Sequence, residues 1–184
     1  MYISDKATII GDRFTEKIKL MSNNRAFRYV LVDIDSAEFS ELKITRKQLL
    51  VLSAIYYGCY CYFEVRKDSS TSTNHMFRAS EIVELSQGYP PPSMRRVLGM
   101  PEKVSIDMDA PINKPRQIKG LAIQLMLKGL IVPEKISVTK NQIDHKKMNI
   151  LRGQLKQGEY QRYMISEKGL KYMSWYLMMG NNAP

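Results

Sequence analysis

Residues 114–131 read KPRQIKGLAIQLMLKGLI, and this stretch decides which fold the sequence predicts. Pro115 lies where a first helical residue needs no N–H donor, and Gly129 is placed to end the helix. Between them, apolar side chains recur at the i, i+3, i+4 and i+7 spacing of one helix face, at Ile118, Leu121, Ala122 and Leu125. The stretch therefore predicts an amphipathic helix over residues 115–128, with this stripe against a core.

The opposite face of the predicted helix carries side chains that suit contact with DNA. With the stripe turned inward at about 100° per residue, the outward positions and their flanks are Arg116, Gln117, Lys119, Gly120, Ile123, Gln124 and Leu127. Arginine bonds guanine in a bidentate manner, glutamine bonds adenine, and an exposed isoleucine can touch a thymine methyl. Gly120 would let a phosphate approach closely. The alternative interpretation is an ordinary solvated helix face.

Further helices and strands are predicted on both sides of this helix. Thr45, Ser80 and Ser166 are placed as N-terminal caps. The apolar spacing after these caps predicts helices over residues 46–65, 81–87 and 167–179. Segments rich in β-branched and aromatic residues predict strands over residues 26–34, 135–140 and 160–165.

The chain of 184 residues has room for one domain with attachments. We predict three parts: an N-terminal extension over residues 1–44 that contains a strand, a domain over residues 45–179, and a tail over residues 180–184. Residues 88–113 contain five prolines, which allow little regular structure beyond one turn at residues 94–98.

The order of the elements is that of a winged helix-turn-helix, whose second motif helix enters the DNA major groove and whose following hairpin is the wing. Three stretches resemble the winged-helix bacterial regulators of the MarR type. They are residues 78–85 (RASEIVEL), residues 114–131 and residues 163–173 (YMISEKGLKYM). The resemblance covers residues 45–179, with residues 88–113 as an insertion between the motif helices. It implies a mainly α fold with a small antiparallel β wing, an α+β winged helix with an N-terminal extension.

The distribution of charge points to an anionic partner. The chain has 28 Lys and Arg against 18 Asp and Glu, a net charge of +10. Residues 115–158 hold nine of the basic residues and only two acidic ones, as expected of a surface that binds a polyanion. The hairpin over residues 140–158 would lie along a phosphate backbone, and the alternative is a solubilising loop. The predicted DNA-binding residues are Ser80, Arg116, Gln117, Lys119, Gly120, Gln124, Lys140, Lys146, Lys147, Arg152 and Lys156.

The last predicted helix is apolar nearly all round, so it is expected to be buried on several sides or to dock on another chain. Because helix-turn-helix proteins commonly pair to read two half-sites, we predict a homodimer. Packing against the chain's own N-terminal segment is the alternative. The predicted interface residues are Tyr172, Trp175, Tyr176 and Met179.

Several other classes of protein are disfavoured. The sequence lacks an apolar run long enough for a membrane span and an apolar core near its start like that of a signal peptide. Two cysteines make no disulfide framework, which favours the cytoplasm. Cys59 and Cys61 lie two apart on a helix and point about 200° apart, so they predict no metal site; Cys59 is expected to be buried and Cys61 partly exposed. Asp33 and Asp35 resemble a phosphatase motif, but the chain has no parallel α/β core to support it.

The sequence thus predicts a sequence-specific double-stranded DNA-binding protein, a transcriptional regulator, with no enzymatic activity, no cofactor and no metal. A plasmid or phage replication or maintenance protein is a second hypothesis, because initiators also use winged helices. A winged-helix module for protein interaction is a third. The sequence identifies neither the operator nor a small-molecule effector.

Overall fold

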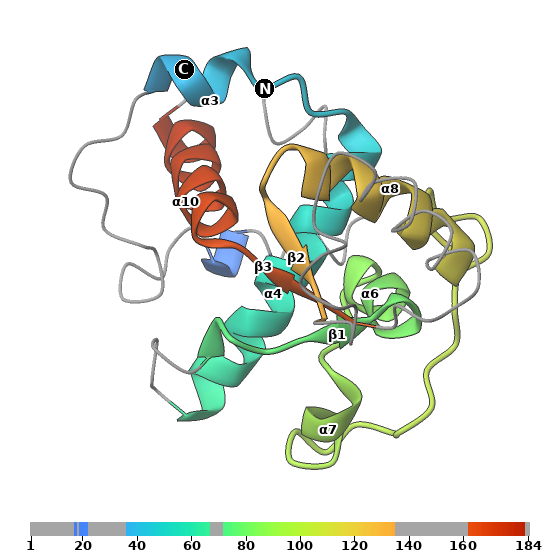
Figure 1. The fold of residues 1–184 in the computed structure, drawn as a ribbon. Helices are drawn as coiled ribbons and strands as arrows, with labels where there is room; N and C mark the ends of the chain where they lie inside the picture. Colours follow the sequence, from blue (N-terminus) through green and yellow to red (C-terminus); the bar gives the residue numbers. More distant parts are fainter. Residues whose placement is uncertain (1–16, 18, 22–35, 67–71, 135–161, 183–184) are drawn as a thin grey trace.

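The computed structural model describes residues 17, 19–21, 36–66, 72–134 and 162–182. Helices predominate, and three short strands form one small antiparallel sheet among them (Figure 1), so the predicted α+β class is confirmed at that level. In chain order the elements are α3 (Ser36–Glu41), α4 (Arg46–Arg66), β1 (Phe77–Arg78), α6 (Ala79–Ser86), α7 (Pro92–Arg95), α8 (Pro115–Leu127), β2 (Ile131–Pro133), β3 (Arg162–Ile165) and α10 (Glu167–Asn182).

The sheet joins segments that are far apart in the sequence. Its strand order is β1-β3-β2, with both pairs antiparallel, so β3 lies in the middle. Tyr163 on β3 is paired with Phe77 on one side and with Pro133 on the other, and its own side chain is fully buried. The sheet therefore fastens the segment before α6 and the segment after α8 to the same central strand.

Helix α4 is the centre of the core. Its residues from Leu49 to Cys61 are all buried, and it packs against α6, α8 and α10. Thr45 caps it, because the Thr45 hydroxyl accepts a hydrogen bond from the Gln48 N–H at 3.2 Å, while the Gln48 side-chain oxygen accepts one from the Thr45 N–H at 3.3 Å. The cap predicted at Thr45 is confirmed.

The proline-rich insertion is held to α6 by a buried arginine. Arg95 on α7 is 1% exposed, and its guanidinium donates to the carbonyls of Pro90 and Glu102 and to the carboxylate of Glu84, at 3.0, 2.7 and 2.5 Å. The Gln87 amide, at the end of α6, also exchanges hydrogen bonds with the backbone of Asp107. The segment is thus packed and fixed even though it contains little regular structure.

Several predicted boundaries need correction. Helix α6 begins at Ala79, so the predicted start at residue 81 is wrong; the N-cap position belongs to Arg78, and Ser80 lies inside the first turn. Ser80 is therefore not the cap. Helix α10 continues to Asn182, beyond the predicted end at residue 179, and shortens the predicted tail. The predicted strands over residues 26–34 and 135–140 lie outside the described residues, whereas β2 and the helix α3 were not predicted.

Both cysteines are buried in α4, so the expectation of a partly exposed Cys61 is wrong. Burial is the main cause that raises the pKa of the Cys61 thiol to about 11, with a hydrogen bond to Tyr57 acting in the opposite direction. The same burial raises the pKa of Cys59 further. Neither thiol is exposed enough, or acidic enough, to act as a nucleophile.

Candidate nucleic-acid interface

Helix α8 has the amphipathic character that its sequence predicts. Ile118, Ala122 and Leu125 are fully buried against α4 and α6. Pro115 occupies the first turn, and Gly129 follows the helix with a φ of 73°, a left-handed conformation that glycine adopts without strain. The predicted start is confirmed, and the helix ends at Leu127, one residue before the predicted end. Three of the four stripe residues are buried, but Leu121 is half-buried, and Ile123, predicted to face outward, is also half-buried because it packs against the core.

The outward face of α8 is open and cationic. Arg116 and Gly120 are exposed, Leu127 is 55% exposed, and Lys119 is half-buried on the flank. A methyl group built on Gly120 would meet no atom of the described residues within 4 Å, so the helix backbone can be approached closely there. The helix contains no acidic residue to offset its cations. The two cations Arg116 and Lys119 therefore lie on this face without an acidic side chain of the same helix.

Gln117 has a structural role that the sequence pattern did not indicate. Its side-chain oxygen accepts hydrogen bonds from the N–H groups of Asn113 and Lys114, both at 2.9 Å, and its amide nitrogen donates to the Pro111 carbonyl at 3.3 Å. The side chain therefore closes the insertion onto the first turn of α8. Because both ends of the amide are engaged, Gln117 is not available in this arrangement to read a base.

Gln124, also on a flank of the helix, is exposed, and it joins α8 to α4. Its side-chain oxygen accepts a hydrogen bond from Gln48, which is almost wholly buried at the start of α4. One turn further on, the Lys128 ammonium donates to the Gln48 side-chain oxygen at 2.7 Å and to the backbone carbonyl of Lys43. The end of α8 and the beginning of α4 are thus linked by a chain of polar side chains.

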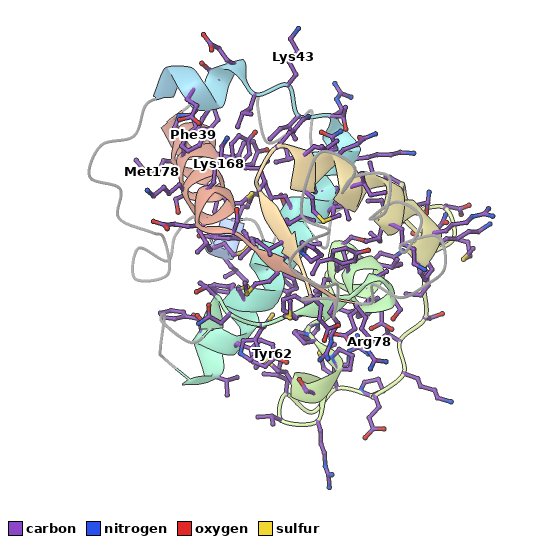
Figure 2. All side chains as sticks on the ribbon, viewed as in Figure 1. Phe39, Lys43, Tyr62, Arg78, Lys168 and Met178 are labelled. Atoms are coloured by element: carbon purple, nitrogen blue, oxygen red, sulfur yellow. The ribbon has the colours of Figure 1, made fainter. Side chains whose placement is uncertain are left out.

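Ser80 is exposed in the first turn of α6, next in the chain to the charged residue Glu81. Arg78 and Arg162 act electrostatically on the neighbouring carboxyl of Glu81, whose pKa is nevertheless raised because half-burial dominates. Arg162 in turn pairs with Glu134 at 2.5 Å. Figure 2 labels Arg78 beside α6, on the same side of the molecule as α7.

The predicted wing lies outside the described residues, which resume only at Arg162 after Glu134. This applies to the five cations predicted to track phosphates, Lys140, Lys146, Lys147, Arg152 and Lys156. Strands β2 and β3 pair in register from Ile131 and Ile165 to Pro133 and Tyr163, so the chain leaves and re-enters the sheet at adjacent points. The assignment of a wing to residues 140–158 stays a prediction.

The predicted dimer residues are partly used within the chain. Tyr172 is buried, with its ring edge-on to Phe39 of α3 at 5.7 Å, and Trp175 lies 5.8 Å from the same ring. Lys168 adds an ion pair to Glu38 at 3.4 Å; Figure 2 shows Phe39 and Lys168 on the same side of the molecule. For Tyr172, this arrangement agrees with the alternative to a dimer contact, which is packing against the chain's own N-terminal segment. Trp175 and Tyr176 are half-buried, and the Met179 side chain lies outside the described part.

Among the described residues, no cluster of three or more histidine, cysteine or acidic side chains could hold a metal ion. None of the helices in the described part is both long and apolar enough to cross a membrane. No protein family, curated protein or solved structure matches the chain.

Proposed function

We propose that this protein binds double-stranded DNA in a sequence-specific manner through α8 and acts as a transcriptional regulator of winged-helix architecture. The arrangement of the described elements supports the architecture. A helix, a strand, three helices and two further strands follow one another from α4 to β3, with the first strand beside the last in the sheet. In a winged helix this order makes α6 and α8 the two helices of the motif, and the residues between β2 and β3 the wing.

The observation that carries the proposal is the outward face of α8. Arg116 is exposed in the first turn, the part of a recognition helix that meets base edges, and Lys119 lies one turn beyond. A guanidinium at this place can bond both acceptors of a guanine, and the exposed Leu127 adds apolar contact area. Gln117, predicted to read a base, instead fixes the helix that would present Arg116.

The experiment begins with selection of bound fragments from a random duplex library, followed by measurement on the enriched sequence. Arg116→Ala should weaken binding to that sequence by about 1–3 kcal/mol and binding to random duplex much less. Arg96→Ala, which removes an exposed cation from the insertion, is the matched control and should leave the ratio of the two affinities unchanged. Equal losses on both duplexes from Arg116→Ala would exclude base reading by α8.

A second selection, from fragments of the source genome, separates the alternatives. A replication or maintenance protein would enrich repeated sites from an origin, whereas a regulator would enrich sites near promoters. A protein-interaction module would enrich none. Exposed apolar residues on the insertion, Val97 and Leu98 at 72% and 50% exposure, favour the module among these alternatives. Failure to enrich any duplex would therefore favour a protein-interaction module that uses Val97 and Leu98, which follow α7.

A further inference from the structure

A second cationic surface lies beside α8, where no DNA contact was predicted from the sequence. Lys43, Arg46 and Lys47 are all exposed at the start of α4, and none forms an ion pair with an acidic side chain of the described residues. In Figure 2 the Lys43 side chain points away from the body of the molecule. Glu41, two residues before Lys43, is an exposed acidic residue close to it in the sequence. We name Lys43, Arg46 and Lys47 the α4 basic surface.

These cations are unfavourably placed for the helix itself. The N-terminal end of a helix carries the positive end of the macrodipole, where acidic side chains stabilise and basic ones do not. The first turn of α4 nevertheless has no acidic residue and begins with Arg46 and Lys47. Violations of such local rules are expected where a surface serves binding rather than stability. An anion bound there would neutralise the repulsion.

The polar link to α8 fixes this surface relative to the proposed reading face. Gln124 and Lys128 lie on one flank of α8, about 80–120° around the helix from Arg116, and both are bonded to Gln48 of α4. Lys128 is also bonded to the carbonyl of Lys43. The α4 basic surface therefore lies beside the C-terminal half of α8, adjacent to its outward face.

The dimensions fit a duplex. The 13 residues of α8 extend about 20 Å, more than the width of a major groove, which is about 12 Å. A helix with its first turn at the base edges therefore reaches the sugar–phosphate backbone by its last turn. Lys128 is engaged with protein acceptors at that end, and the exposed cations of the described residues beside it are Lys43, Arg46 and Lys47.

We infer that Lys43, Arg46 and Lys47 bind the phosphate backbone of the same duplex that α8 reads. This inference rests on the proposed function and deepens it. It assigns to the start of α4 the contacts that set the register of the protein on DNA, while base readout stays with α8. Phosphate contacts position a protein without distinguishing sequences, so these residues contribute equally to specific and non-specific affinity.

The test is the triple variant Lys43→Ala/Arg46→Ala/Lys47→Ala, titrated with duplex DNA between 50 and 300 mM salt, on the order of the range over which counterion release is resolved. The log–log slope of affinity against salt should flatten by about 2.7, at 0.9 for each of the three phosphate contacts, and affinity at low salt should fall about tenfold or more on enriched and random duplex alike. The fold should survive, because the bond from Lys128 uses the Lys43 backbone carbonyl, which alanine retains. A melting temperature no lower than that of the unaltered chain checks this.

A charge-matched control, Arg96→Ala/Lys103→Ala/Lys171→Ala, removes three cations elsewhere and should leave the slope within error of the unaltered chain. A slope that flattens equally in the control would assign the effect to net charge and overturn the inference. An unchanged slope in the folded α4 triple variant would overturn it too, while binding by α8 would stand. If the unaltered chain itself bound no duplex, the proposed function would fail first. If the α4 triple variant lost binding only to phosphatidylserine vesicles or to single-stranded RNA, and kept its binding to duplex DNA, the inference would also be overturned.

Discussion

Arg95→Met tests whether one buried guanidinium holds the insertion in place. The substitution keeps an apolar stem of similar length but removes donors to the carbonyls of Pro90 and Glu102 and to the Glu84 carboxylate. Breaking a buried ion pair by removing one partner costs about 3–5 kcal/mol. Because the Glu84 side chain is 24% exposed and water can reach it, we expect the lower end of that range, about 3 kcal/mol.

Urea denaturation followed by circular dichroism measures this loss. With a slope of about 2 kcal/mol per molar urea, the midpoint should fall by about 1.5 M at unchanged slope. Arg96→Met, at the exposed neighbouring position, is the control and should stay within about 0.5 kcal/mol of the unaltered chain. A midpoint for Arg95→Met that matches the control would show that the insertion is held by other contacts.

The double variant Arg95→Met/Glu84→Gln isolates the ion pair from the two carbonyl bonds. Neutralising Glu84 removes the charge that Arg95→Met leaves without a partner, so the double variant should be about 1–2 kcal/mol more stable than the sum of the single effects predicts. Strict additivity would mean that Arg95 acts only through the carbonyls of Pro90 and Glu102.

Three further predictions concern the core. Gly169→Ala should strongly destabilise the fold, because a Cβ there would lie 2.1 Å from the Leu130 carbonyl oxygen. Gly120→Ala, at an open position, should instead stabilise it by about 0.5–1 kcal/mol. Similar melting temperatures for the two variants would contradict the packing at α10. The Cys61 thiol should resist alkylation at pH 8 until urea unfolds the chain, and rapid labelling of the native protein would contradict its burial. Because burial raises the pKa of this thiol, its contribution to the free energy of unfolding should be lost as pH rises above about 9. Phe39→Ala should cost about 3 kcal/mol in urea denaturation, and a loss under 1 kcal/mol would mean that α3 contributes little to covering α10.

The parts of the fold that the sequence predicts correctly are those set by local spacing and capping. The stripe of Ile118, Ala122 and Leu125 identifies α8 because its period alone determines which side is buried. Thr45 and Ser166 cap the helices that follow them; the Gly169 N–H donates to the Ser166 hydroxyl at 3.0 Å. In each case the partner atoms lie within four residues of one another, so a sequence pattern contains them.

What the sequence could not supply depends on partners far along the chain. The cap predicted at Ser80 failed because Arg78 belongs to β1, a two-residue strand that exists only through its pairing with β3 more than eighty residues later. The α4 basic surface was missed for a similar reason: Lys43 and Lys128 are separated by 85 residues and meet only in the folded chain. Periodicity along one helix gives no indication of such a junction.

The restraints on α8 also bear on how tightly it can bind. At its first turn, the Gln117 amide closes the loop from Pro111 to Lys114, and Gln87 bonds the carbonyl of Ile112 in the same loop at 3.1 Å. At its last turn, Gln48 bonds both Gln124 and Lys128. A surface fixed at both ends loses little conformational entropy on binding, and this cost otherwise offsets much of the gain from contacts. Releasing either end, for instance by Gln48→Ala, should therefore lower the affinity of α8 for any ligand. Gln48 itself is buried and would not touch that ligand.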